Sequence, residues 1–504
     1  MNKFNKILLA LLFSVALIGC SDDDEATPDR PSASVDSPVK EVKPGSDAVF
    51  TLDISAPGTV KSVTASAGTV DQTAVVGKTS GTATVTYSSD TEGEQLIEVT
   101  ITDNNDKVDN RSMLVKVLED AVEVIIVDAN ITTDETWVSG NIYRLAGRIA
   151  VEDGATLTIE AGTIIKGEAG TGANSTALIV ARGGKLMAEG TANSPIIFTS
   201  VADEILPGQI ASPNLDPDIN GLWGGLIVLG KAPISSAKGV EQQIEGIPGD
   251  DSNGLYGGTE AADNSGVIKY ISVRHGGTNI GEGNEINGIT LGGVGSGTTI
   301  EYVEVIGNQD DGIEWFGGTV DVKNAVIWNA GDDAVDTDQD WIGMLYNFAI
   351  VAGSDTDHAF ELDGPEGTQR TALGHTIRKG SVKGYIATDN GNIVAGGAEL
   401  GNWRAMVELT MDSIYFFNFT DPVLSDGRGD FSFSDGSEQN YVDGSILLSN
   451  LETVLPTGIT LDQVFKSGTD QDATAVTTPD KSGVDKSVFA GWSWTFIAGE
   501  LNDF

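Results

Sequence analysis

The chain repeats its own sequence over residues 298–364, and this repeat limits the possible folds more than any other feature. Asp310 aligns with Asp332 and Glu314 with Asp336, at the same offset in both cases. A third copy follows at a slightly longer offset, and a fainter copy precedes the first. Self-similarity at a nearly fixed period of this size indicates supersecondary units that stack on one another.

The repeated units have the pattern of short β-strands. Apolar runs at Ile300–Ile306, Val322–Trp328 and Leu345–Val351 end in turns of Gly, Asn and Asp, with no helical periodicity between them. Short strands that return at this period without crossover helices predict a parallel β-helix with one repeat per coil. An antiparallel sandwich is the alternative, but sandwiches do not ordinarily repeat their sequence. We predict an all-β chain with this solenoid over residues 122–445.

The composition fits such a fold and restricts its partners. Glycine accounts for 63 of the 504 residues, and tight solenoid turns require glycine. The formal net charge of −45 makes nucleic acid and anionic membrane surfaces poor partners, whereas cations are good ones. The single cysteine excludes a disulfide framework and a cysteine-based zinc site.

That cysteine lies where a lipid anchor would be attached. Residues 1–19 carry two lysines and then an apolar run, Ile7–Ile18, which predicts a secretory signal peptide too short to span a membrane. Leu17-Ile-Gly-Cys20 resembles a bacterial lipobox, which implies that Cys20 is the lipidated first residue of the mature protein. The acidic stretch Ser21–Glu25 resembles the signal that sends Bacteroidetes-type lipoproteins outside the outer membrane. We therefore expect a lipid-anchored outer-membrane protein exposed on the cell surface.

Three further segments complete the organisation. Residues 20–38 are acidic and contain several prolines, which predicts a tether. Residues 39–118 alternate apolar and polar positions, with turn clusters at the spacing of a sandwich, and predict one small immunoglobulin-like β-sandwich that acts as a spacer. Residues 446–504 are irregular, and we expect Trp492, Trp494 and Phe496 to form an aromatic end cap over the last coil.

The solenoid segment resembles a family without a settled activity. The resemblance rests on Gly221-Leu-Trp-Gly-Gly-Leu-Ile-Val-Leu-Gly230, Asp263-Asn-Ser-Gly-Val-Ile-Lys-Tyr-Ile271 and Phe489-Ala-Gly-Trp-Ser-Trp-Thr495, and it covers Val122–Phe504. These phrases are similar to those of right-handed β-helix lipoproteins from Bacteroidetes-type bacteria. The resemblance implies the fold and the location. Some members sit near TonB-dependent receptors, which implies a role in capturing a nutrient beside such a receptor.

Stacking the repeats in register places acidic residues in columns along the solenoid. Coils are about 4.8 Å apart, and two carboxylates at that spacing repel by about 3–4 kcal/mol at an effective dielectric of about 20. A bound hard cation with oxygen ligands would offset this repulsion. Turn formation by Asp is the alternative, but it does not account for the glutamates. We predict a calcium site formed by Asp310, Glu314, Asp332, Asp336 and Glu361.

An enzymatic interpretation uses the neighbouring column. Asp311, the pair Asp332 and Asp333, and His358 resemble the active-site rungs of polygalacturonase-like glycoside hydrolases, in which carboxylates on adjacent coils act as acid and base. The sequence Asp357-His-Ala lacks the Gly-His-Gly frame of that family, and its Arg-x-Lys element has no counterpart. We therefore expect a non-catalytic ligand-binding or scaffold role, with a polysaccharide-active hydrolase or lyase as the alternative.

Overall fold

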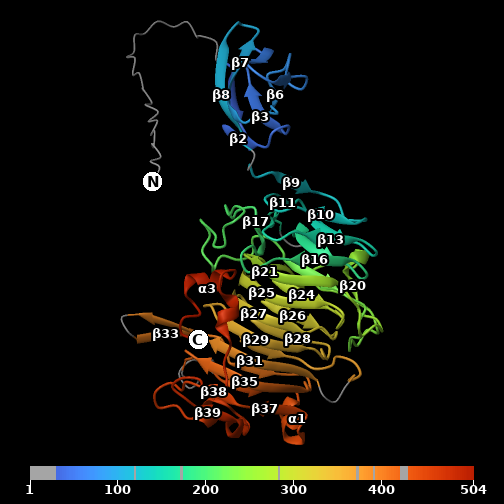
Figure 1. The fold of residues 1–504 in the computed structure, drawn as a ribbon, viewed down its shortest axis with the longest axis vertical. Coiled ribbons are helices and arrows are strands. Elements are labelled where there is room, and N and C mark those ends of the chain that lie inside the picture. Colours follow the sequence, from blue (N-terminus) through green and yellow to red (C-terminus); the bar gives the residue numbers. More distant parts are fainter. Residues whose placement is uncertain are drawn as a thin grey trace. The chain divides into compact units, whose positions relative to one another are not determined.

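The computed structural model divides the chain into two compact units, Met1–Ala121 and Val122–Phe504 (Figure 1). The structure describes residues 30–118, 121–170, 174–281, 284–370, 374–389, 392–420 and 429–504. The predicted signal peptide, the predicted lipidation site Cys20 and the first part of the predicted tether lie outside the described residues. Within the described residues, no helix has the length and apolar character needed to cross a membrane.

The N-terminal unit consists of two four-stranded sheets. One has the order β1 (Ser32–Val35), β3 (Asp47–Ser55), β6 (Ser80–Ser88) and β5 (Thr69–Asp71), and the other β2 (Val39–Val42), β8 (Val108–Val117), β7 (Gly93–Asp103) and β4 (Val60–Ala65). Strands β2 and β8 pair in parallel, and the other pairs are antiparallel. Phe50 and Leu52 of the first sheet pack with Ile97 and Val115 of the second. The two sheets fit the predicted sandwich.

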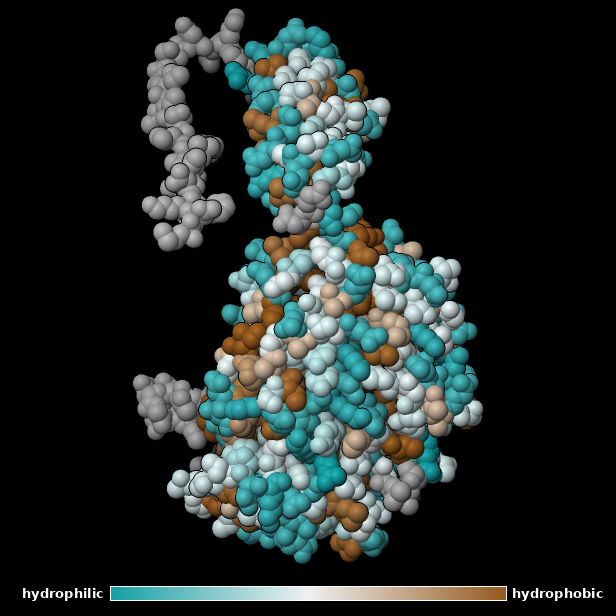
Figure 2. Space-filling view, viewed as in Figure 1, coloured by the Kyte–Doolittle hydropathy of each residue, from teal (hydrophilic) through white to brown (hydrophobic). Residues whose placement is uncertain are grey.

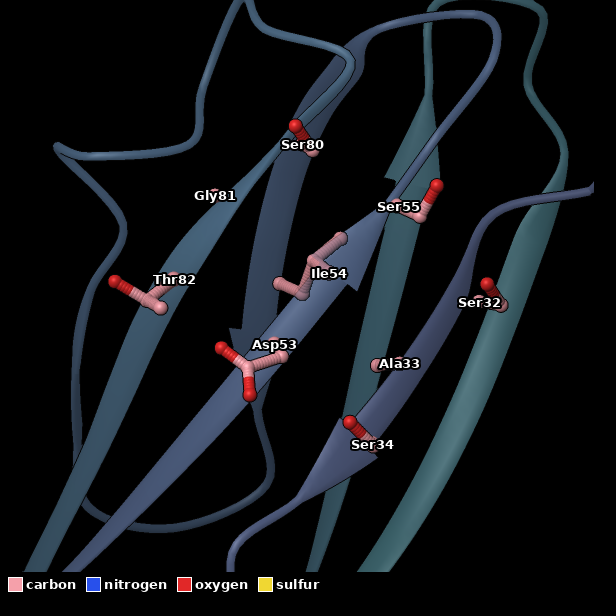
Figure 3. A pocket seen from close by; sticks show the side chains of 9 residues that line it. All are labelled: Ser32, Ala33, Ser34, Asp53, Ile54, Ser55, Ser80, Gly81 and Thr82. Atoms are coloured by element: carbon pink, nitrogen blue, oxygen red, sulfur yellow. The ribbon is translucent and has the colours of Figure 1, made fainter.

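A shallow pocket of about 510 Å³ lies on β1, β3 and β6 of this unit (Figure 3). Serine and threonine hydroxyls and the carboxylate of Asp53 supply its polar side-chain groups. The residues that line it include no aromatic ring and no basic group.

The second unit is a parallel β-helix made of two long sheets. The 16-stranded sheet contains β9 (Val124–Val127), β10 (Glu135–Trp137), β11 (Ile142–Leu145), β13 (Thr156–Ile159), β14 (Ile164–Gly167), β16 (Lys185–Glu189), β17 (Ile196–Ser200), β21 (Gly266–Arg274), β25 (Thr299–Asn308), β27 (Val322–Ala330), β29 (Met344–Val351), β31 (His375–Lys383), β35 (Leu409–Phe417), β37 (Ile446–Ser449), β38 (Leu451–Thr453) and β39 (Ala473–Ala475). The nine-stranded sheet contains β12 (Arg148–Val151), β15 (Ala177–Val180), β18 (Leu226–Leu229), β24 (Ile289–Gly292), β26 (Ile313–Phe316), β28 (Val335–Asp338), β30 (Phe360–Leu362), β34 (Gly401–Trp403) and β36 (Phe431–Phe433). The described strands of both sheets pair in parallel, as the repeat predicted.

Short elements decorate these coils. The hairpins are β19 (Gln242–Gln243) with β20 (Leu255–Tyr256), β22 (Thr278–Gly281) with β23 (Asn284–Ile286), and β32 (Tyr385–Asp389) with β33 (Asn392–Gly397). The α-helices are α1 (Ser437–Asp443), α2 (Leu461–Val464) and α3 (Trp494–Ala498). The surface seen in Figure 2 is mainly hydrophilic, with apolar residues scattered over it, as the acidic composition leads one to expect.

Long strands of the larger sheet bend at one fixed position per coil. The bend residues have φ between 49° and 63°, in the left-handed region, and are Tyr270, Tyr302, Asn324, Asn347, Lys379, Ser413 and Asn450. Asparagine tolerates this conformation better than most residues, and Nδ2 of Asn347 donates a 2.8 Å hydrogen bond to Oδ1 of Asn324. The rings of Tyr270 and Tyr302 stack with their centroids 4.2 Å apart. Each coil therefore has three faces, two from the bent strand and one from the nine-stranded sheet.

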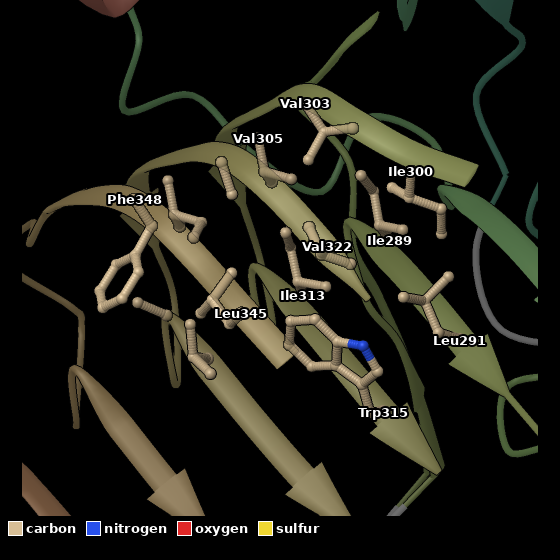
Figure 4. Close-up of a cluster of buried hydrophobic side chains, with 14 of the residues drawn as sticks. Ile289, Leu291, Ile300, Val303, Val305, Ile313, Trp315, Val322, Leu345 and Phe348 are labelled. Atoms are coloured by element: carbon tan, nitrogen blue, oxygen red, sulfur yellow. The ribbon is translucent and has the colours of Figure 1, made fainter. Parts of the chain in front are cut away.

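The interior of the solenoid is a continuous apolar core (Figure 4). Ile313 and Trp315 of the nine-stranded sheet meet Val303, Val322 and their neighbours from the larger sheet. Full burial of each such side chain contributes about 1.5–3 kcal/mol, so the stacking of coils itself stabilises the fold.

Residues 484–504, here named the C-terminal clasp, lie along the flank of the larger sheet. Helix α3 of this segment lies beside β25 and β27 (Figure 1). The aromatic residues Phe489, Trp492 and Trp494 of the clasp cover an apolar patch that includes Ile306 and Val326. The expectation of an aromatic end cap over the last coil was wrong for the two tryptophans. The outward-facing apolar residues of β25, β27 and β29 need cover, and the clasp provides it.

A buried carboxylate fixes the clasp to the coils. Glu304 accepts hydrogen bonds from Oγ of Ser493 at 2.6 Å, from Oγ1 of Thr495 at 2.9 Å and from the main-chain N–H of Thr495 at 3.0 Å. Oγ of Ser272 donates to the same carboxylate at 2.5 Å. Nη2 of Arg274 lies 3.6 Å from it, and both charged side chains are fully buried. The carboxylate oxygens of Glu304 therefore hold together residues that are far apart in the sequence.

Candidate functional site

The outer face of the nine-stranded sheet changes character along the solenoid. In the early coils, Ile179 and Ile227 are neighbours in one outward-facing column and pack in a cluster with Ile244 and Tyr256 of the loop after β18. From β24 onward the same column is polar, and its residues are Thr290, Glu314, Asp336, Glu361 and Asn402. The early strands of the sheet are therefore covered by a loop, whereas the outer face of its later strands is acidic.

The structure brings the predicted columns into register. Glu314 on β26 pairs with Asp336 on β28, which pairs in turn with Glu361 on β30. In the turns before these strands, the main-chain N–H of Asp357 donates to the carbonyl of Asp332 at 2.8 Å. The offsets between the sequence copies thus correspond to neighbouring coils.

In the column of Asn287, Asp311, Asp333 and His358, main-chain N–H groups donate hydrogen bonds to side-chain oxygens of the preceding coil. The N–H of Asp311 donates to Oδ1 of Asn287 at 3.3 Å, and the N–H of Asp333 donates to Oδ1 of Asp311 at 2.9 Å. The N–H of His358 then donates to Oδ1 of Asp333 at 2.8 Å. Asp311, Asp333 and His358, three of the proposed catalytic residues, are buried in this column. Asp332 is exposed beside it.

Carboxylate oxygens converge in two overlapping groups at this face. Asp310, Asp311 and Asp332 each place an oxygen within 4.8 Å of the others, and so do Asp311, Glu314 and Asp336. Asp311 belongs to both groups. We name these five residues the upper cluster. Oxygen-rich groups of this kind suit a hard divalent cation.

Burial raises the pKa of every carboxyl in the upper cluster, and neighbouring carboxylates raise it further. The pKa of Asp310 rises to about 8 and that of Asp332 to about 6. The pKa values of Asp311, Glu314 and Asp336 lie well above their ordinary range for the same two reasons. Oδ1 of Asp336 is buried and has no hydrogen-bond partner among the described residues. Full ionisation of the cluster would therefore bring together more negative charge than its surroundings offset.

A second group of residues includes two basic side chains, and we name it the lower cluster. Its members are Asp333, His358, Glu361, Asp363 and Arg404. Nδ1 of His358 lies 2.7 Å from Oδ1 of Asp333 and 3.7 Å from Oε1 of Glu361. Burial alone would lower the pKa of His358, but the hydrogen bond and charge of Asp333 raise it to about 9. Arg404 contacts Glu361 at 2.7 Å and forms two hydrogen bonds to Asp363, at 2.7 and 3.0 Å. His358 and Arg404 thus supply positive charge from within the protein at this end of the face.

The upper cluster has no such partners of its own. Among the described residues, no Lys, Arg or His forms an ion pair with one of its carboxylates. The charge of His358 acts on Asp332 from the next coil, and the charge of Arg404 acts on Asp336 from two coils away. The face therefore has a half on β26 and β28 without ion pairs to basic side chains, and a half on β30 and β34 that is partly compensated by His358 and Arg404.

Sequence reasoning missed three residues of the site. Asn287, whose Nδ2 donates to Oε2 of Glu314, lies in the faint first copy of the repeat, so its alignment with Asp311 was an available signal. Glu245 reaches the cluster from the loop after β18, and burial raises its pKa to about 7. Arg404 follows β34 and lies beyond the three clear copies. Neither Glu245 nor Arg404 belongs to the repeat that revealed the columns.

Stacked parallel coils with an acidic outward face define a parallel β-helix protein with an acidic outer surface on one sheet. A family model described as a pectate-lyase like beta helix domain matches residues 129–392, which is more than half of the chain. The chain belongs to this family. No curated protein and no solved structure gives a significant match.

Proposed function

We propose that the upper cluster holds a divalent cation, calcium first, and that the loaded face binds a polysaccharide without cleaving it. One observation carries this proposal. Oδ1 of Asp336 is buried without a partner among the described residues, in a group of carboxylates with which no described basic side chain forms an ion pair. Buried carboxylates ordinarily have partners, so this arrangement calls for a ligand that supplies positive charge.

A cation suits the upper cluster better than protons alone do. Protons can hold the charge down while the pKa values stay high, but they leave the oxygens without a common partner. Ca²⁺ takes six to eight oxygen ligands in flexible geometry, and Asp311 would bridge the two groups of this cluster. Glu245 would add a ligand from the covering loop, because its carboxyl interacts with that of Glu314.

The ligand class follows from the family and from charge. The family is described as pectate-lyase like, which supports a polysaccharide ligand. A protein of net charge −45 repels an acidic glycan unless a cation bridges the two, and a face-bound cation with open positions can accept glycan oxygens.

Two observations favour binding over catalysis. Oδ1 of Asp311 and Oδ1 of Asp333 already accept main-chain hydrogen bonds from the next coil. Both residues are also buried, which suits a structural ladder. The second candidate, a hydrolase or lyase, keeps one argument in its favour, since Asp311, Asp332, Asp333 and His358 do lie together on three consecutive coils.

The location forms part of the same proposal. Lipidation of Cys20 would anchor the protein in the outer membrane, and the acidic stretch after it supports exposure on the cell surface. The face would then meet glycans outside the cell, beside a TonB-dependent receptor that takes up the captured nutrient. The support for this part is the N-terminal sequence and the family resemblance.

The test compares the wild type with Asp336→Asn and with the control Asp355→Asn, which changes an exposed aspartate outside the cluster. Melting is followed in high salt with chelator and then with calcium. At a hundredfold excess over the dissociation constant, calcium should stabilise the wild type and the control by about 2.7 kcal/mol, and Asp336→Asn much less. Equal melting with and without calcium in all three proteins would refute the cation site.

The glycan arm uses polygalacturonate as the probe. We expect the wild type to bind it in calcium and to release it in chelator, with no new reducing ends and no unsaturated product. Calcium-dependent appearance of either product would replace the binding proposal with the enzymatic one.

A further inference from the structure

The last two coils meet at an acidic and a basic side chain. Asp430 directly precedes β36, and Lys466 lies just after α2. Phe431 and Phe465 form a parallel bridge, so the two segments run side by side. Nζ of Lys466 is in direct contact with Oδ2 of Asp430. The contact therefore joins neighbouring rungs of the solenoid.

The surroundings of this pair are unusual for a surface ion pair. The side chain of Asp430 is 2% exposed, whereas that of Lys466 is 48% exposed and reaches inward from the surface. The rings of Phe431 and Phe465 lie with their centroids 5.5 Å apart beside it. Burial raises the pKa of Asp430 in spite of the neighbouring lysine. Burial thus stabilises the neutral form of this carboxyl relative to its charged form more than water does.

A second carboxyl stands next to the pair. Glu399 precedes Leu400, whose N–H donates a 2.7 Å hydrogen bond to the carbonyl of Asp430. Burial raises the pKa of Glu399, and the charges of both Asp430 and Lys466 act on it. Three groups therefore come together: an amine, a buried acid and a neighbouring carboxyl that can carry a proton.

We propose that Lys466 and Asp430 condense to a side-chain amide that covalently links the last two coils. Within this contact a proton can pass from Nζ to Oδ2 of the buried carboxyl, which leaves a neutral amine and a neutral acid. Nζ then attacks Cγ of Asp430, a C–N bond forms, and one C–O bond breaks. Glu399 takes a proton from nitrogen and delivers it to the departing hydroxyl, so one water molecule leaves. No oxidant or other reactant is required.

The fold supplies what this condensation lacks in free solution. Holding amine and acid in contact replaces a bimolecular encounter with a unimolecular step. Proton transfer by a positioned carboxyl assists such steps. The bond would close a covalent ring from Asp430 to Lys466 and fasten the end of the solenoid. The inference is independent of the proposed cation and glycan binding.

The experiment is mass spectrometry of a tryptic digest of the full chain. No Lys or Arg lies between Arg428 and Lys466, so an unmodified chain gives the separate peptides 429–466 and 467–481. The amide blocks cleavage at Lys466. We therefore expect one peptide, 429–481, lighter by the mass of one water molecule. Complete cleavage at Lys466, with both separate peptides at their unmodified masses, would overturn the proposal.

Three variants sharpen the test. Lys466→Arg keeps the charge but cannot form the amide, so it should give the separate peptide 429–466 and melt at a lower temperature. Asp430→Asn should give a cross-linked peptide of the same mass as the wild type, because ammonia leaves instead of water. Glu399→Gln should cross-link at least tenfold more slowly. A Glu399→Gln chain that reacts as fast as the wild type would overturn the role given to that carboxyl.

Discussion

The main-chain N–H of Asp333 donates a 2.9 Å hydrogen bond to Oδ1 of Asp311, one coil earlier. The same pattern joins Asp311 to Asn287 and His358 to Asp333. The acidic side chains of this column therefore have a structural role, which is to accept main-chain hydrogen bonds from the next coil. The acceptor atom stabilises the stack, while the negative charge opposes it.

This division predicts different effects for two substitutions of Asp311. Asp311→Asn keeps an oxygen acceptor and removes a charge, so without calcium its free energy of unfolding should equal or exceed that of the wild type. Asp311→Ala leaves the N–H of Asp333 unsatisfied and should cost about 1–3 kcal/mol. Urea unfolding in chelator measures both, with Asp355→Ala as an exposed control. Equal losses in the Asn and Ala variants would contradict the acceptor role.

The raised carboxyl pKa values predict how stability depends on pH. Asp332, Glu245 and Asp310 have folded pKa values of about 6, 7 and 8, above their unfolded values, so the folded state binds more protons. Their contribution is fully present below about pH 4 and is lost as the pH rises through about 8. In chelator, the melting temperature should therefore fall over this window.

Calcium should flatten the same profile, because the cation replaces the protons that leave. The measurement is a series of melting curves from acidic to mildly alkaline pH, with chelator and with calcium. A melting temperature that rises with pH in chelator would show that these carboxyls ionise freely in the folded state.

The contact between Glu304 and the clasp predicts a large loss from a small change. Glu304→Gln leaves the buried guanidinium of Arg274 without its counter-charge, which should cost about 3–5 kcal/mol. The control is Glu301→Gln, where a partly exposed pair with Lys269 at 3.3 Å should matter by less than about 1 kcal/mol. Equilibrium unfolding compares the two. Similar losses in both variants would argue against a special role for Glu304.

The anchor predicts a change of location without a change of fold. Cys20→Ala should move the protein from the membrane fraction to the soluble fraction and abolish labelling by a fatty-acid analogue. Circular dichroism of the released protein should match that of the wild type. Retention in the membrane fraction with unchanged labelling would contradict the proposed lipidation of Cys20.

The sequence predicted the acidic columns because their spacing follows from the coil period alone. Once Asp310 aligns with Asp332, and Asp336 with Glu361, parallel pairing in register places them on neighbouring coils. Such a prediction needs no knowledge of side-chain packing. It extends only as far as the repeat remains clear.

What lies outside the repeat could not be predicted in this way. Glu245 reaches the site through a loop whose path depends on the apolar seat formed by Ile179 and Ile227. Arg404 comes from a later coil with a different spacing. The aromatic run at Trp492 was placed wrongly because nothing local distinguishes a cap over the end from a cover along the side. The outward-facing Val326 and Trp328 were the missing indication.

The two tyrosines at the left-handed bends affect how such a protein can grow by copying its coils. Tyr270 and Tyr302 have left-handed backbone conformations, in which a bulky residue is strained. Each of their rings packs in a T-shaped arrangement against the ring of Trp492, with centroid distances of 5.7 and 6.5 Å. A duplicated coil carrying Asn450 would bring its own suitable bend residue and lies outside the apolar patch that the clasp covers. A duplicated coil carrying Tyr302 would instead need a longer clasp, and so would one carrying Asn324, because Val326 and Trp328 on the same strand also lie under the clasp. Lengthening of this protein in evolution should therefore occur at the Asn450 end and spare the coils under the clasp.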